Sequence, residues 1–179
     1  MNGTNRDAAS MNTSALALKP LTAEAFAPFG QVIQKKDRFL EEINYGHTRK
    51  YADLATVDVS DASGQTGVHL FNSSPVSLPL RIEILERHPL GSQAFYPLHK
   101  RPFLVVVAPA GDVPQAADVR AFISNGAQGI NYRKGVWHHY QITLGEPADY
   151  LVIDRVGPGE NFEEHRLEQG LVISELPAA

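Results

Sequence analysis

The chain of 179 residues contains no cysteine. This absence excludes disulfides, thiolate catalysis and sulfur-bound metals, and it leaves histidines and carboxylates as the candidate metal ligands. A basic block is missing too, because 16 Lys and Arg stand against 20 Asp and Glu, for a net charge of −4. Nucleic acid and membrane surfaces are therefore poor candidate partners.

Long apolar runs are also missing. No stretch approaches the length of a membrane span, and residues 1–14 are polar, without the apolar core of a signal peptide. We therefore predict a cytoplasmic protein with a disordered leader over residues 1–14. The rest of the chain is long enough for one sizeable core and shows no internal repeat, so we expect a single domain over residues 15–160.

What the sequence does contain is a series of short extended segments between turn residues. Long helical periods do not separate them, which favours a mainly β fold, an antiparallel sandwich or barrel. One short helix is predicted over residues 22–29, and a second could form in the charged C-terminal tail, residues 161–179. The predicted strands cover residues 66–71, 80–87, 93–96, 103–108, 119–123, 137–142 and 150–155.

The segment 129–139, GINYRKGVWHH, carries the strongest chemical signal. Gly129 and Gly135 favour tight turns at the ends of short strands, because glycine accepts a positive φ. His138 and His139 are neighbours in a predicted strand, so one should face inward and the other outward. An inward imidazole in the mouth of a small barrel can transfer protons or bind a metal.

Further polar residues lie at the ends of other predicted strands. His88 follows the alternating strand 80–87, and His88 and His138 on facing strands could accept protons near neutral pH or bind a metal. The simpler alternative is a patch of aromatic and histidine side chains around Trp137 that packs a dimer. Arg155 ends a buried strand, where it could form an internal salt bridge or hold a substrate carboxylate. The loop 97–102, which carries Lys100, is interpreted as a solvated hairpin tip or as a loop over the barrel mouth.

Five segments together resemble the ureidoglycolate lyases of allantoin catabolism. They are 85–95 (LERHPLGSQAF), 120–126 (RAFISNG), 128–132 (QGINY), 136–139 (VWHH) and 153–155 (IDR). The resemblance extends more weakly over nearly everything between residues 16 and 159. It implies a cupin-like β-barrel, a double-stranded β-helix, that is usually a homodimer and cleaves ureidoglycolate to glyoxylate and urea.

The resemblance to the general cupin metal motifs is partial. The spacing over residues 135–138 fits the second motif, whereas Leu90 replaces the second histidine of the first motif after His88. A site of three histidines and one carboxylate therefore cannot be assembled from these segments. Nickel is associated with the family, which makes His88 and His138 the expected ligands of an activating divalent metal.

The activity that the resemblance implies needs a base for the substrate hydroxyl and an acid for the leaving nitrogen. We expect His138 or His88 to remove the proton, and the other histidine or Tyr132 to protonate urea. The expected substrate contacts are Arg87, Gln93, Lys100, Asn131, Trp137 and Arg155.

Within that set, Gln93 or Asn131 would bind the ureido group. Asn72 stands where relatives are expected to carry an arginine, so Arg87, Lys100 or Arg155 would hold the substrate carboxylate. Two alternatives stay open. One is a metal-dependent cupin of another class, a dioxygenase or isomerase, and the other is a cupin-like sensor that binds a small carboxylate.

Overall fold

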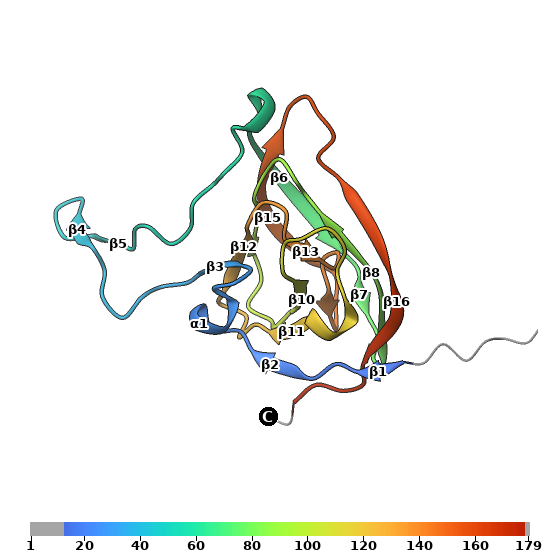
Figure 1. Cartoon of the computed structure of the whole chain (residues 1–179). Helices are drawn as coiled ribbons and strands as arrows, with labels where there is room; N and C mark the ends of the chain where they lie inside the picture. The colour runs from blue at the N-terminus through green and yellow to red at the C-terminus, as the bar shows by residue number, and fades with distance from the viewer. Residues whose placement is uncertain (1–12, 178–179) are drawn as a thin grey trace, which may run out of the picture.

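The computed structural model describes residues 13–177, which form two large β-sheets that curl around a common interior (Figure 1). The seven-stranded sheet holds, in spatial order, β1 (Ser14–Ala15), β16 (Glu163–Ile173), β8 (Leu80–Arg87), β13 (Trp137–His138), β10 (Leu104–Ala108), β11 (Arg120–Ile123) and β2 (Leu18–Pro20). The five-stranded sheet holds β3 (Gly30–Ile33), β12 (Gly129–Tyr132), β9 (Gln93–Pro97), β15 (Ala148–Val156) and β6 (Gln65–Ser73).

Strand pairing in both sheets is antiparallel, except that β1 runs parallel to β16 and β2 parallel to β11. The structure therefore confirms the predicted mainly β, cupin-like antiparallel barrel with a few short helices. None of the helices between residues 13 and 177 has the length and apolarity that crossing a bilayer requires.

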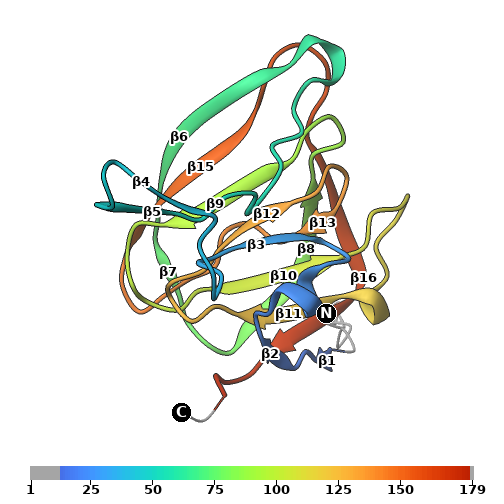
Figure 2. The ribbon, with the colours of Figure 1, turned by 90° about the vertical axis from the view of Figure 1, so that its left-hand side faces the viewer.

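The smaller elements lie at the edges of the barrel. Two short sheets pair β4 (Glu41–Ile43) with β5 (Thr48–Lys50) and β7 (Pro75–Val76) with β14 (Thr143–Leu144). The helical turns are α1 (Ala23–Phe26), η1 (Asp61–Ser63) and η2 (Ala116–Asp118). Thr22 caps α1 as predicted, because its Oγ1 accepts a hydrogen bond from the amide of Ala25 at 3.1 Å. The segment that carries β4 and β5 projects away from the sheets in Figure 1 and crosses in front of the five-stranded sheet in Figure 2.

Strand β10 lies between the two hydrophobic clusters that residues 13–177 form, and all five of its residues are buried. Val105 and Val107 point into the barrel interior, toward Phe95 and Tyr150. Leu104 and its alternating neighbours point the other way, into a second cluster that β8 and β16 share. This confirms the prediction that the uninterrupted apolar run at 103–108 has both faces covered.

The C-terminal tail differs from its prediction. A short helix was expected there, but Glu163–Ile173 forms strand β16, which pairs with β8 and belongs to the barrel. Leu167 and Leu171 are both buried, and their spacing of four residues resembles a helical period. Residues four apart also share one face of a strand, so pairing with β8 buries both leucines, on either side of a register shift between Arg166 and Leu171.

The N-terminal prediction falls largely outside the described residues, which begin at 13. Ser14, the last residue of the predicted leader, already pairs with Leu171 as the first residue of β1.

Two further details of segment 129–139 were wrong. Gly135 has the expected positive φ of 75°, but Gly129 begins β12 with an ordinary φ. Gly129 is needed for close packing instead, because a Cβ there would lie 2.7 Å from the carbonyl oxygen of Phe95. His138 and His139 are both buried, since β13 ends at His138 and the inward–outward alternation ends with it.

Candidate active site

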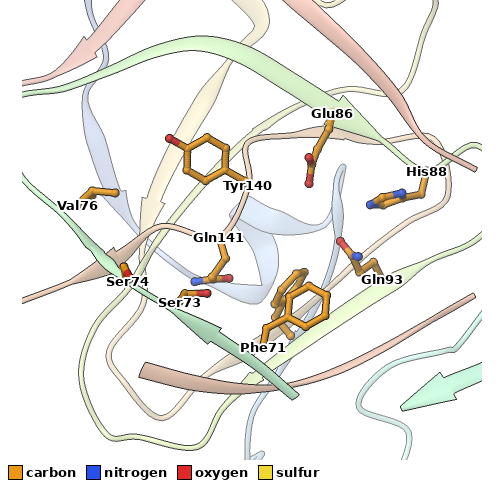
Figure 3. Close-up of a pocket in the computed structure, with 10 residues that line it drawn as sticks. Phe71, Ser73, Ser74, Val76, Glu86, His88, Gln93, Tyr140 and Gln141 are labelled. Atoms are coloured by element: carbon orange, nitrogen blue, oxygen red, sulfur yellow. The ribbon is translucent and has the colours of Figure 1, made fainter. Parts of the chain in front are cut away.

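A pocket of about 500 Å³ opens between the ends of β6, β8 and β9 and the segment that follows β13 (Figure 3). Both sheets contribute to it, so residues distant in sequence meet there. Its lining residues are Phe71, Ser73, Ser74, Val76, Glu86, His88, Gln93, Phe95, Tyr140 and Gln141.

Two imidazoles and one carboxylate gather at one wall of this pocket. Glu86 and His88 are two residues apart at the end of β8, and His138 on β13 pairs with Glu86 in the strand register. Nε2 of His138 lies 3.5 Å from Oε1 of Glu86, and the rings of His88 and His138 are 5.2 Å apart between centroids. One ligand atom from each of the three residues lies within 4.8 Å of the other two. We call Glu86, His88 and His138 the triad.

Backbone carbonyls orient both imidazoles. Nδ1 of His88 lies 2.8 Å from the carbonyl oxygen of Asn161, and Nδ1 of His138 lies 3.1 Å from that of Val136. A carbonyl only accepts, so each Nδ1 carries a proton, and the Nε2 of a neutral ring presents its lone pair to the pocket. Tyr132 stacks on His138 at 4.2 Å between centroids and 15° between planes, which holds that ring in place.

Burial controls the protonation of these groups. Burial lowers the pKa of His88, and the charge of neighbouring His138 lowers it further. Burial raises the pKa of Glu86, but the close contact with His138 and the charges of the nearby histidines outweigh this effect and leave it below its ordinary value. Burial raises the pKa of Tyr132 well above its usual range. At neutral pH the site therefore holds a neutral His88, an ionised Glu86 and a protonated phenol.

Four of the residues expected from the sequence come together here. His88 and Gln93 line the pocket, His138 completes the triad, and Tyr132 packs behind it. Gln93 is 6% exposed and its Oε1 has no hydrogen-bond partner, although its Nε2 donates to Asp154 at 3.2 Å.

Arg87 and Trp137 lie away from the triad. Each is the strand neighbour of a triad residue and so points to the opposite face of the sheet. The Arg87 guanidinium lies 4.5 Å from the Trp137 ring centroid, pairs with Glu163, and donates to the carbonyl of Gly111.

Lys100, Asn131 and Arg155 also lie outside the pocket. Lys100 lines a separate cavity of about 710 Å³, and the amide of Asn131 donates to Gln31 and to the carbonyl of Thr56. Arg155 is buried, and its guanidinium donates to backbone carbonyls of two loops.

Asn72 sits on the opposite face of β6 from Phe71 and Ser73, which line the pocket. Its amide donates to Asp149 at 2.7 Å. Asn72 therefore has no direct contact with the pocket.

Comparison with known proteins identifies the family. Residues 13–174 match the profile of the ureidoglycolate lyase family. A ureidoglycolate lyase of Burkholderia mallei is 51% identical over 160 residues, which cover 89% of this chain and 94% of the relative. Ureidoglycolate lyases of Pseudomonas aeruginosa and Pseudomonas putida are 53% and 48% identical, covering 84% and 89% of this chain and 89% and 96% of their own lengths. The chain belongs to the ureidoglycolate lyase family.

In this member of the ureidoglycolate lyase family, sequence reasoning missed Glu86. The sequence did contain a pattern that predicts its position. Residues two apart in a strand share a face, and Glu86 precedes His88 by two residues. Tyr140, Gln141 and the Ser73–Ser74 pair were also missed, because only folding brings their segments to the pocket.

The triad has the donors that a divalent metal requires. Imidazole nitrogens and carboxylate oxygens suit metals such as nickel and zinc. Both Nε2 atoms are buried without a hydrogen-bond partner, and Glu86 lies beside them. The residues present therefore fit a metal, with Glu86 as a third ligand beside the two expected histidines.

Proposed function

We propose that this chain acts as a ureidoglycolate lyase, which cleaves the C–N bond of ureidoglycolate to yield glyoxylate and urea. The observation that carries the proposal is the family membership, with relatives of that name about half identical over most of the chain. The pocket supports it, because an elimination needs a base and an acid close together, and the His88 and His138 rings are 5.2 Å apart.

In the proposed reaction, Nε2 of His88 accepts the proton of the substrate hydroxyl. The electron pair of that O–H bond forms the carbonyl of glyoxylate, and the pair of the C–N bond leaves with the urea nitrogen. His138 protonates this nitrogen from its Nε2, which lies 3.5 Å from a carboxylate oxygen of Glu86. His88 suits the base because burial lowers its pKa and keeps it neutral. Tyr132, whose pKa is raised, supports the His138 ring instead of donating a proton.

The substrate carboxylate needs a positive charge. Among the described residues that line the pocket, none is a lysine or an arginine. A divalent cation held by the triad would supply that charge to the carboxylate and hydroxyl oxygens. We therefore propose nickel as the first metal to test.

The test measures urea and glyoxylate released from ureidoglycolate by chelator-treated protein, with and without nickel. Equimolar products without metal support proton transfer by the two histidines, and activity restored only by nickel makes them ligands. Absence of turnover under both conditions contradicts the proposed function.

The His138→Gln variant tests the role of the triad. Positioned proton transfer typically contributes about 10²- to 10⁴-fold, so we expect a loss of that order in kcat. His47→Gln is the matched control, because His47 is exposed on the projecting segment. Near-normal turnover by a folded His138→Gln variant would remove His138 from the mechanism.

The homodimer and the cytoplasmic location stay predictions. Val68 and Leu70 on the outer face of β6 are 65% and 70% exposed, and the β9–β15–β6 pairing places Leu151 and Tyr96 in one row with Leu70. This apolar row supports a surface for a second copy. Light scattering coupled to size-exclusion chromatography tests the dimer, and Leu70→Glu should shift it toward the monomer.

A further inference from the structure

Asp154 lies beside the pocket without lining it. It belongs to β15, next to Ile153, which pairs with Ala94 of β9. Asp154 and Gln93 therefore come opposite each other on the inner face of the five-stranded sheet. Oδ2 of Asp154 accepts a hydrogen bond from Nε2 of Gln93 at 3.2 Å.

This contact determines the orientation of the Gln93 amide. An ionised carboxylate only accepts hydrogen bonds, so the NH₂ of Gln93 must face Asp154 and the carbonyl Oε1 must face the other way. Oε1 is buried and has no hydrogen-bond partner, and Figure 3 shows the amide turned toward the space between Glu86 and His88. The pocket therefore presents a free acceptor to which an N–H group of a ligand can donate.

Asp154 is itself held by a second contact. Nε2 of His69 on β6 lies 3.2 Å from Oδ1 of Asp154. His69 lies so close to Gly67 that a Cβ at Gly67 would lie 2.4 Å from the His69 Nε2. The β6 backbone thus leaves room for the imidazole, and each oxygen of the Asp154 carboxylate has its own partner.

We propose that Asp154 is a positioning residue that fixes the Gln93 amide, so that Gln93 Oε1 accepts N–H donors of the ureido group. The inference rests on the proposed function and adds the source of its selectivity. A ureido group carries N–H donors on both nitrogens, whereas glyoxylate and simple carboxylates carry none. Without Asp154 the amide can rotate and present NH₂ to the substrate, which repels an N–H donor.

Two competitive inhibitors of equal size measure this recognition. Hydantoate carries the ureido group and the carboxylate but lacks the hydroxyl, so it cannot undergo the elimination. Levulinate replaces its two nitrogens with carbon and keeps the carbonyl and the carboxylate. The ratio of their inhibition constants therefore reports N–H recognition alone. We expect wild-type protein to prefer hydantoate by about tenfold, a ratio that one hydrogen bond supports.

Asp154→Ala should reduce this preference to about twofold or less and raise KM for ureidoglycolate more than it lowers kcat. Asp154→Asn should keep the preference, because its Oδ1 can still accept from Gln93 Nε2. Asn also removes the carboxylate charge, so an effect of that charge on His88 would appear in both variants. The two variants therefore differ in one respect, because Asp154→Ala loses the oxygen that accepts from Gln93 Nε2 and Asp154→Asn keeps it.

A second pair of variants covers the case in which Asp154→Ala does not fold. Gln93→Glu alone places two carboxylates together and should lose affinity for hydantoate. When Gln93→Glu is combined with Asp154→Asn, the carboxylate introduced at position 93 accepts from the asparagine amide and keeps one oxygen facing the pocket. The double variant should therefore recover the preference.

The outcomes separate the two proposals. If wild-type protein releases urea and glyoxylate but Asp154→Ala keeps the full preference for hydantoate, the positioning role is wrong. Failure of the swapped pair to recover the preference also contradicts it, as does a wild type that binds both inhibitors equally. Selective hydantoate binding without urea release would contradict the proposed function and leave the role of Asp154 intact.

Discussion

Replacing Arg155 should destabilise the fold and leave substrate affinity unchanged. The sequence offered two roles for this arginine, a substrate contact and an internal anchor. In the structure it is 7% exposed, and its guanidinium donates to the carbonyls of Asp61, Ala62 and Pro158 at 2.6–3.2 Å. These contacts join the η1 loop and the turn after β15 to the end of β15.

The expected magnitude follows from these contacts. Hydrogen bonds to charged groups contribute about 1.5–3 kcal/mol each, and water replaces part of that where the loops meet solvent. We therefore expect Arg155→Met to lower the free energy of unfolding by about 3–5 kcal/mol, or the Tm by about 6–20 °C for a chain of this length. Arg155→Lys keeps the charge and one or two donors, so its loss should be about 2 kcal/mol.

Thermal unfolding followed by circular dichroism measures the loss, and KM is determined well below both transitions. Arg38→Met is the matched control, because Arg38 is exposed on the projecting segment and should leave the Tm unchanged. An Arg155→Lys protein that melts with the wild type but shows a KM raised about tenfold or more would refute this reasoning, since a change of that size places the guanidinium on the substrate.

Three other changes test the fold and the boundaries of the site. Deleting residues 160–179 removes β16 and uncovers β8, so no cooperative thermal transition is expected. Gly129→Ala places a Cβ 2.7 Å from the Phe95 carbonyl oxygen and should cost about 1–3 kcal/mol in urea unfolding. Lys100→Ala should leave kcat/KM within about twofold of wild type, because Lys100 lines a separate cavity and exposed residues away from special contacts tolerate change.

Each of these changes has a control or a contradicting result. Deleting only residues 174–179 should preserve the melting transition, and a cooperative transition in the longer deletion would disprove a structural role for β16. Gly111→Ala is the control for Gly129, because a Cβ at Gly111 meets nothing within 4 Å. A loss of tenfold or more in Lys100→Ala would be about 1.4 kcal/mol of transition-state binding and would place this lysine on the substrate.

Much of the secondary structure was readable from local patterns. The predicted strand over 80–87 has the same bounds as β8, although its fully buried residues, Ile82 and Leu85, lie three apart instead of alternating. The apolar run at 103–108 marked a strand covered on both faces. Thr22 correctly predicted the start of α1, because an N-cap side chain bonds only to backbone amides of the first helical turn. The motifs around His88 and His138 were sufficient for the family, since they lie within continuous segments.

Only part of the candidate active site could be predicted from the sequence. His88 and His138 were recognised because both are histidines near strand ends, and Gln93 because it follows His88 closely. Glu86 resembled an ordinary solvent-facing residue of an alternating strand, and nothing local to β6 predicts that Phe71 would reach the same pocket.

The sequence alone determined the extended character of most barrel strands, the cap of α1, the two histidines and the family. Tertiary structure alone decided which strand faces meet, and therefore that Glu86 joins the histidines, that Asp154 orients Gln93 and that Arg155 joins two loops. It also decided that the charged tail is a strand, because pairing with β8 buries Leu167 and Leu171 on one face. The physical reason is that local periodicity depends on near neighbours along the chain, whereas a pocket depends on register between strands far apart in sequence.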